Sequence, residues 1–180
     1  MIDGNSKKGF TLVEALVVVS IMGILSGIGV ASLQSAVANS RIKDAGINVT
    51  AFMERAANEA TRLNEKLAVK VESDNKTLKV YKCSAVDGST GKCNSTGNVV
   101  DAMSLESSNI FVSGSCGESG IDRYSGLVTL SPKIGVSPIP KGCFVVRYGG
   151  SDRRASIIKS ATKFAMFYKL SYDDGSHWEP

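Results

Sequence analysis

The chain opens with a short polar stretch and continues into a long apolar segment. Between Phe10 and Leu33 the only charged residue is Glu14. Because about 20 apolar residues are enough for a helix to cross a membrane, this pattern predicts a membrane-embedded helix over residues 10–33. A charged side chain at the centre of such a helix costs roughly 2.5–3.5 kcal/mol. Glu14 lies near the end of the segment, where the cost is lower, but it still needs a partner.

After Leu33 the pattern becomes amphipathic. Apolar residues recur every three or four positions, as on one face of a helix; they are Ile42, Ala45, Val49, Phe52, Ala56, Ala60, Leu63 and Leu67. The positions between them are mostly charged or polar. We therefore expect one helix from about Phe10 to about Glu65, whose second half, residues 34–65, packs its apolar face on a globular domain.

Beyond Glu65 the apolar positions recur every second residue. Residues 67–72 and 78–81 alternate around a turn signal at Ser73–Lys76, which predicts a β-hairpin. Residues 83–98 are polar and glycine-rich and predict a surface loop. Further strands are expected over residues 109–113, 126–131, 142–148, 155–160 and 163–172. Three prolines confine residues 132–141 to turns or a sheet edge; they are Pro132, Pro138 and Pro140.

Several short strands after one long helix indicate an α+β fold. The expected architecture is a long N-terminal helix packed on an antiparallel β-sheet, with residues 66–180 forming a β-rich globular head. The length of 180 residues suits one modest domain together with such a helix.

Four cysteines follow the apolar segment: Cys83, Cys93, Cys116 and Cys143. None of them belongs to a Cys-x-x-Cys pair and the only histidine is His177, so no metal site is expected. An oxidising compartment would convert the four thiols to two disulfides. Three pairings are open, of which we favour Cys83–Cys93, which closes a short loop, together with Cys116–Cys143.

Candidate catalytic residues are scarce. His177 lies within Asp173–Trp178, which has the composition of a mobile tail, and the chain has no Ser/His/Asp order, phosphate loop or Cys/His pair. Asp173 and Asp174 are adjacent carboxylates, but a calcium site needs six or more oxygen ligands. The sequence therefore predicts neither an enzyme nor a bound cofactor.

The residues at the start of the apolar segment form a motif. Lys7-Lys8-Gly9-Phe10, then Thr-Leu, then Glu14 and an uninterrupted apolar helix resemble the prepilin signature of type IV pilins and type II secretion pseudopilins. The resemblance implies that prepilin peptidase removes residues 1–9 by cutting between Gly9 and Phe10, and that Phe10 is then N-methylated. It also implies that Glu14 engages the terminal amine of a neighbouring subunit during assembly.

Three other interpretations of this segment are weaker. A buried core helix of a soluble protein would normally keep a polar face, which this segment lacks. A secretory signal peptide has an apolar core of about 7–15 residues, which is shorter than this one. A plain single-pass anchor fits the length but leaves Gly9 and Glu14 without a role. In either membrane interpretation Lys7 and Lys8 keep the N-terminus cytoplasmic. The chain would then be a single-pass inner-membrane protein with a periplasmic or extracellular head.

The region after the membrane segment indicates which kind of pilin-like subunit the chain resembles. Residues 54–64 followed directly by a β-hairpin are similar to the H-type minor pseudopilin and to the FimT-type minor pilin. This similarity implies a structural subunit for type II secretion or type IV pilus biogenesis. The implied partners are other pilin subunits and an inner-membrane assembly platform.

The alternative function is that of a DNA-binding minor pilin for natural transformation. Some FimT-type proteins bind DNA through a Gly-Arg-x-Arg motif, whose nearest counterpart here ends in Arg153 and Arg154. Asp152 and the spacing depart from that motif. If residues 155–160 return beside 142–148, further cations would gather with the two arginines at one end of the sheet; they are Arg147, Lys159 and Lys163. Phosphate binding usually needs a larger basic patch, and the net charge is only +4.

Overall fold

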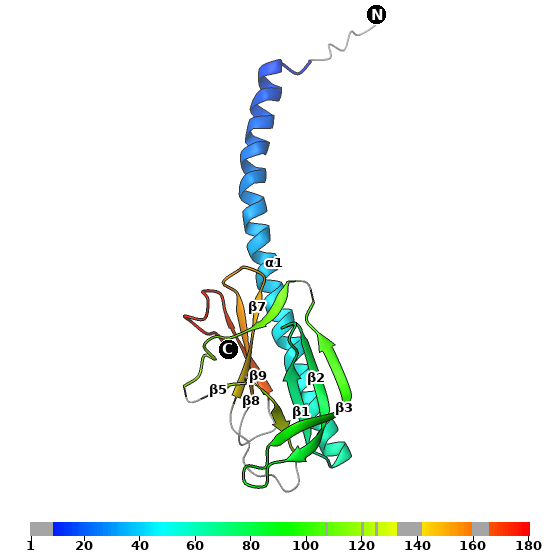
Figure 1. Ribbon diagram of the computed structural model, residues 1–180. Helices are drawn as coiled ribbons and strands as arrows, with labels where there is room; N and C mark the ends of the chain where they lie inside the picture. Colours follow the sequence, from blue (N-terminus) through cyan, green and yellow to red (C-terminus); the bar gives the residue numbers. More distant parts are fainter. Residues whose placement is uncertain (1–8, 107, 120, 125, 133–141, 160–165) are drawn as a thin grey trace, which may run out of the picture. The chain divides into compact units, whose positions relative to one another are not determined.

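The computed structural model describes residues 9–106, 108–119, 121–124, 126–132, 142–159 and 166–180. The chain divides into two compact units, Met1–Val37 and Ala38–Pro180. One helix, α1 (Leu12–Leu63), belongs to both units, and every β-strand of the described residues lies in the second (Figure 1). The fold is α+β, as the sequence predicts.

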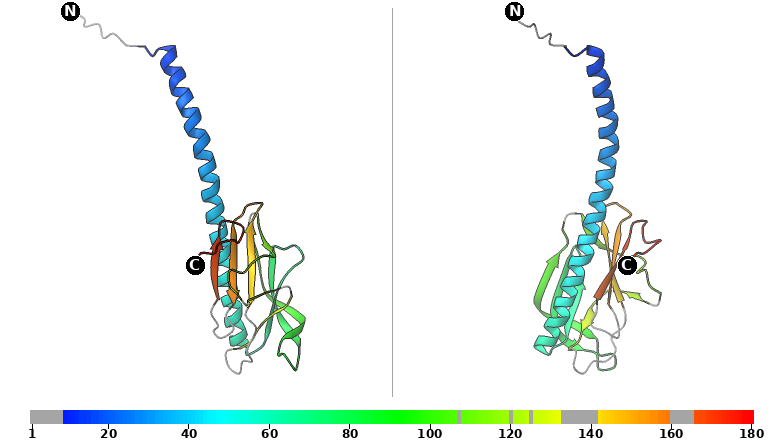
Figure 2. Two further views of the ribbon diagram at one scale, coloured as in Figure 1. Left: turned by 90° about the vertical axis from the view of Figure 1, so that its left-hand side faces the viewer. Right: turned by 180° about the vertical axis from the view of Figure 1, so that it is seen from behind.

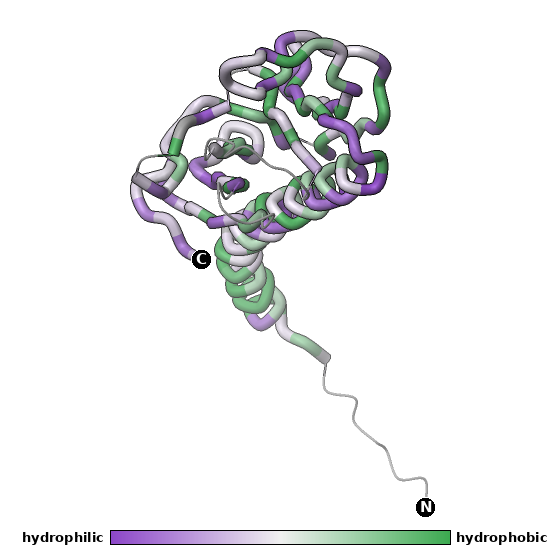
Figure 3. The backbone as a smooth tube through the Cα atoms, turned by 90° about the horizontal axis from the view of Figure 1, so that it is seen from below, coloured by the Kyte–Doolittle hydropathy of each residue, from purple (hydrophilic) through white to green (hydrophobic). Residues whose placement is uncertain are grey.

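The first unit consists of the N-terminal part of α1. From Leu12 to Val37 every side chain that the structure describes is exposed. α1 is long and apolar enough to cross a membrane, and its N-terminal turns are mostly hydrophobic (Figure 3). Every backbone N–H and C=O group inside a helix is paired within the helix, which is the condition for crossing a bilayer.

The part of α1 that belongs to the second unit buries one face. The face predicted from the sequence is buried from Ile42 to Ala60 and is widened by Met53 and Ala57. At Gly46 the helix packs tightly on the second sheet, because a Cβ there would come within 3.2 Å of the Tyr168 ring. The one error in the predicted face is Leu67, which belongs to the first strand rather than to the helix.

The helix ends two residues before the expected position. Asn64 adopts a left-handed conformation with φ of 51°. Its N–H donates to the Thr61 carbonyl and the Glu65 N–H donates to the Ala60 carbonyl, both at 3.2 Å. This pair of bonds satisfies carbonyl groups that the last turn of a helix leaves free, so the chain can turn directly into the first strand.

The strands form two sheets instead of the single expected sheet. In the first, β1 (Leu67–Val71) pairs antiparallel with β2 (Thr77–Val86) and with β6 (Val128–Leu130), and β2 pairs with β3 (Cys93–Ser104). The predicted hairpin is the β1–β2 pair. The predicted loop over residues 83–98 is wrong, because most of it belongs to a second hairpin, β2–β3. Within that hairpin, residues 83–98 are largely exposed on both faces, so they lack the apolar alternation that marks a half-buried strand.

The second sheet has the order β4-β7-β8-β9, and each of these neighbours pairs antiparallel. Its strands are β4 (Asn109–Val112), β7 (Gly142–Tyr148), β8 (Arg154–Lys159) and β9 (Met166–Ser171). A two-residue strand, β5 (Asp122–Arg123), runs parallel to the start of β7. Sequence periodicity predicts the four longer strands, whereas β5 is too short to show a period. The expected turns at Pro138 and Pro140 and the start of the expected last strand lie outside the described residues.

Two apolar clusters hold the second unit together. The main one joins the buried face of α1 to both sheets, with Ile42, Leu78 and Ile157 among its members (Figure 2). A smaller cluster covers the other face of the second sheet. It contains the four buried residues Cys116, Cys143, Val145 and Ile158, with Val112, Ile121 and Trp178 packed against them.

The C-terminal segment is not the mobile tail that the sequence predicts. Asp173 accepts hydrogen bonds from the Ser171 hydroxyl (2.8 Å) and from the His177 N–H (2.9 Å). Glu179 pairs with Leu170 beside β9, and Trp178 packs on the smaller cluster. Composition alone misses these contacts, because the polar residues of the segment hydrogen-bond to one another and its single large apolar residue reaches the core.

Candidate functional site

The candidate site at the N-terminus begins with an exposed, non-helical segment. Gly9, Phe10 and Thr11 precede the helix, and the Phe10 side chain is 77% exposed. No described atom lies within 4 Å of the position that a Cβ on Gly9 would occupy, apart from its chain neighbours. No residue of the described part of the chain therefore covers the bond between Gly9 and Phe10, which suits the proposed cleavage. Lys7 and Lys8 lie outside the described residues.

Thr11 and Glu14 cap the start of α1 reciprocally. The Glu14 N–H donates to the Thr11 hydroxyl oxygen at 3.2 Å. In return, Glu14 Oε2 accepts from the Thr11 N–H at 3.2 Å and from the Thr11 hydroxyl at 3.1 Å. This is a capping box, in which two side chains satisfy backbone N–H groups that the first turn of a helix leaves free. A carboxylate in the first turn also interacts favourably with the helix dipole.

The capping box defines what the Glu14 carboxylate can do next. Only Oε2 accepts hydrogen bonds from described residues, so Oε1 remains open to a cationic group outside this chain. From the sequence, Glu14 is a carboxylate that needs a partner, and Thr11 has no predicted role. The signal was nevertheless present, because a threonine three residues before a glutamate at the start of an apolar run is a known helix-start pattern.

The helix surface after Glu14 offers almost only apolar contacts. Leu16, Ile24 and Leu33 are each more than 60% exposed. The Ser20 hydroxyl donates to the Leu16 carbonyl at 2.8 Å and so leaves no unpaired donor. Such a surface favours lipid or the apolar helix of another subunit over water.

The two candidate nucleic-acid residues are both engaged within the head. Arg154 forms an ion pair with Asp174, and only 13% of its side chain is exposed. Arg153 Nε donates to Asn39 Oδ1 on α1 at 3.0 Å. The two guanidinium groups therefore have separate protein partners and do not form one exposed pair for phosphate.

The further cations that the DNA-binding alternative would bring to one end of the sheet do not gather there in the described part of the chain. Arg147 lies opposite Arg154 in the β7–β8 pair, but Lys159 lies opposite Gly142 at the other end of that pair. Lys159 is also buried, and burial lowers the pKa of its ammonium group. Lys163 lies outside the described residues. β8 runs antiparallel to β7 over its full length, so Lys159 and Arg154 lie at opposite ends of the pair and the DNA-binding alternative loses this support.

The four cysteines form two disulfides in the structure, Cys83–Cys93 and Cys116–Cys143. This is the pairing favoured from the sequence. The Cα–Cα distances are 5.6 and 6.1 Å, which are within the usual range for a disulfide. The first bridge closes the β2–β3 hairpin, and the second ties the segment after β4 to the start of β7.

The acidic pair Asp173–Asp174 is used for local structure. The N–H and imidazole of His177 and the Ser171 hydroxyl lower the pKa of Asp173, while Asp174 faces Arg154. Among the residues that the structure describes, no three His, Cys, Asp or Glu side chains are placed to hold a metal ion.

Comparison with known protein families finds a match at the N-terminal site. The family model described as the prokaryotic N-terminal methylation motif matches residues 4–30, which contain Gly9, Phe10, Thr11 and Glu14. This motif indicates a subunit of the type IV pilin or pseudopilin type, which assembles with other such subunits after processing by prepilin peptidase. The comparisons with curated proteins and with solved structures give no match.

Proposed function

We propose that this chain is a minor structural subunit of a type IV filament system that serves type II secretion or pilus biogenesis. The observation that carries the proposal is a methylation motif whose glutamate caps an exposed apolar helix directly after the candidate cleavage site. In this function the apolar half of α1 anchors the chain in the inner membrane until assembly. It then packs with the same segment of other subunits, while the head faces outward.

The proposed assembly step is the pairing of Glu14 with an amine. Cleavage after Gly9 turns the Phe10 nitrogen into a positively charged amine, which methylation leaves charged. The open Oε1 of Glu14 accepts from the amine of a neighbouring subunit, while Oε2 stays in the capping box. A buried charge without its partner costs several kcal/mol. A wrong axial register is therefore penalised, and the correct pair lowers the cost of leaving the membrane.

The remaining features of the proposal concern location. The basic leader stays on the cytoplasmic side, prepilin peptidase removes residues 1–9, and an inner-membrane platform feeds the mature chain into the filament. The disulfides suit a head in the oxidising periplasm or outside the cell. The DNA-binding alternative has less support, because Arg153 and Arg154 are held by Asn39 and Asp174.

Processing is tested on protein isolated from the native host. Intact mass and N-terminal sequencing should give a chain that begins at Phe10 and carries one methyl group. An uncut Met1, or a cut near residues 31–35, would contradict the proposal. A bulky residue in place of Gly9 should block cleavage, whereas Gly9→Ala should retain part of it.

The role of Glu14 is tested with two variants. Glu14→Ala should insert in the membrane and keep a folded head, but it should lose incorporation into filaments. Thr11→Ala removes the threonine hydroxyl from the capping box and keeps the carboxylate, so it should incorporate better than Glu14→Ala. Filament content is measured by shearing and immunoblotting. Wild-type incorporation by Glu14→Ala would show that the carboxylate is incidental.

A further inference from the structure

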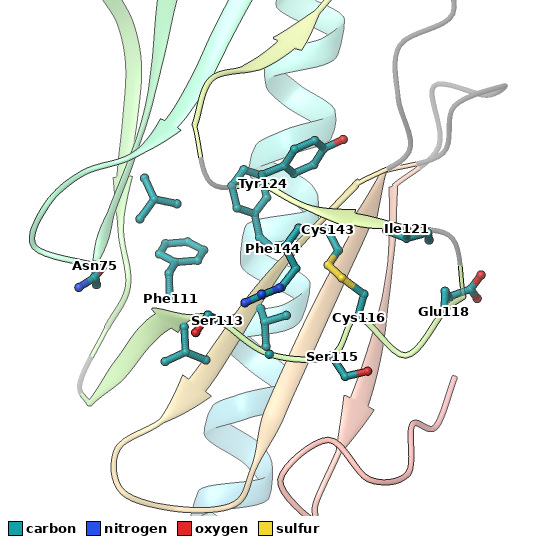
Figure 4. Close-up of a pocket in the computed structure, with 15 residues that line it drawn as sticks. Asn75, Phe111, Ser113, Ser115, Cys116, Glu118, Ile121, Tyr124, Cys143 and Phe144 are labelled. Carbon is teal, nitrogen blue, oxygen red and sulfur yellow. A yellow bond between two sulfur atoms is a disulfide. The ribbon is translucent and has the colours of Figure 1, made fainter.

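A hollow of about 1050 Å³ opens on the head, far from the N-terminal site in sequence. Its walls come from the turn after β1, from β4 and the segment that follows it, and from β5 and β7. Figure 4 shows Phe111, Phe144 and Tyr124 around it, with the Cys116–Cys143 disulfide alongside. The volume is large enough for several side chains of a bound ligand.

The floor of this hollow is aromatic. The Phe144 ring lies 6.0 Å from Phe111 and 5.1 Å from Tyr124, centroid to centroid. Tyr124 packs over Gly142, where even a Cβ would overlap its ring. Phe111 and Phe144 are only 7% and 4% exposed, so a ligand would contact their remaining exposed surface together with the half-buried Tyr124 ring.

One wall of the hollow is backbone without regular pairing. Ser113, Gly114 and Ser115 continue the edge strand β4, line the hollow and make no backbone–backbone hydrogen bond in the described part of the chain. Edge backbone of this kind can pair with an added strand.

The hollow also carries an unneutralised positive charge. Arg123 lines it, is exposed, and has no ion pair with any residue that the structure describes. Among the described lining residues the one carboxylate, Glu118, is already paired with Lys169 Nζ at 2.9 Å. The charge complementary to this hollow is therefore negative.

We propose that this hollow binds an extended polypeptide segment of a partner protein that carries an acidic side chain flanked by apolar ones. The peptide backbone pairs with Ser113–Ser115, alternate apolar side chains cover Phe111 and Phe144, and a carboxylate meets Arg123. This recognition mode combines main-chain hydrogen bonds for affinity with side-chain contacts for specificity. It is independent of the filament function, because binding at this site involves no N-terminal residue.

The test uses full-length protein in detergent and fluorescein-labelled probes of about eight residues, with binding followed by anisotropy. The acidic probe alternates valine and glutamate, the basic probe alternates valine and lysine, and a third probe is the acidic peptide with N-methylated backbone amides. The acidic probe should bind more tightly than the other two. Equal binding of the N-methylated probe would refute the strand-pairing mode, and no binding of the acidic probe at millimolar concentration would refute the site.

A charge swap makes the test specific to the hollow. Arg123→Glu should weaken the acidic probe roughly tenfold, since a charge-assisted hydrogen bond is lost, and should strengthen the basic probe. The matched control is Lys92→Glu, which makes the same charge change at an exposed position in the turn of the β2–β3 hairpin. It should leave both affinities unchanged. An equal loss in the two variants would mean that the probes sense only the overall charge of the protein.

Discussion

The two parts of α1 share one helical backbone and differ in what surrounds them. Within residues 12–37 every described side chain is exposed and most are apolar, whereas residues 38–63 bury one face and keep charges on the other. The second part completes its burial within its own chain. The first part leaves its apolar surface for lipid or other subunits, so its stable environment has to come from outside the molecule.

The two ends of the helix also differ in whether their hydrogen-bonding and charged groups find all their partners within the chain. At the C-terminal end Asn64 closes the helix with backbone hydrogen bonds, a purely local solution. At the N-terminal end the side chains of Thr11 and Glu14 close it, and one of them is charged. A charged cap costs little at a membrane surface but needs a counter-charge once it is buried. The N-terminal cap therefore suits a helix end that moves between these environments.

The largest expected effect tests the difference between the two parts of α1 by removing the same side-chain atoms from each of them. Ile42 is fully buried and Ile24 is 66% exposed. Ile42→Ala should lower the free energy of unfolding of the head by about 2–5 kcal/mol, because it leaves a cavity in the core. Ile24→Ala should leave it unchanged. Urea unfolding in detergent, followed by the fluorescence of Trp178, the only tryptophan, measures both. Equal effects would mean that the two parts do not differ in their packing.

The two disulfides allow the same comparison between a buried and a largely exposed region of the head. Replacing Cys116 and Cys143 by serine should cost about 2–4 kcal/mol, because the bridge spans 27 residues and both sulfur-bearing side chains are buried. The same replacement at Cys83 and Cys93 should cost less, since that bridge spans 10 residues in a largely exposed hairpin. The same unfolding assay ranks the two. The reverse order, or free thiols in protein from the periplasm, would contradict this prediction.

Sequence periodicity predicts the elements that have one apolar and one polar face. Both parts of α1, the β1–β2 hairpin and the longer strands of the second sheet are of this kind. In the β2–β3 hairpin, residues 83–98 are largely exposed on both faces, so periodicity predicts a loop there instead of two strand ends. The C-terminal segment is held by hydrogen bonds and an ion pair between residues whose types also occur in tails. Its contacts depend on tertiary structure and leave no periodic signal.

The candidate sites also differ in whether their residues lie close together in the sequence. Gly9, Phe10 and Glu14 lie within six residues of one another, so their relation can be read from spacing alone. Whether Arg153 and Arg154 face solvent depends on Asn39 and Asp174, which lie far from them in the chain. The hollow that Arg123 lines is formed by several segments that are far apart in the sequence, so no local sequence pattern predicts it.

The smallest expected effect is a loss of stability of the head, but not of the N-terminal part of α1, when the pH is lowered. Between residues 9 and 37 the single titratable side chain is Glu14, whereas the head contains Asp74 in the turn after β1. The Thr77 hydroxyl and the N–H groups of Lys76 and Thr77 lower the pKa of Asp74 from its ordinary value of 3.8 to about 2. A carboxylate whose pKa is lower in the folded state stabilises the fold above its unfolded pKa. This stabilisation should be complete above about pH 4 and should vanish as the pH falls to about 2.

Asp74→Ala removes this contribution and tests its sign. At about pH 5 the variant should unfold at a lower urea concentration than the wild type, and at about pH 2 the two midpoints should converge. The matched control is Glu54→Gln on α1, an exposed carboxylate with no hydrogen bond or ion pair among the described residues. Its midpoint should follow the wild type at both pH values. If the difference between Asp74→Ala and the wild type stayed constant across this range, the Asp74 charge would have no part in stabilising the turn.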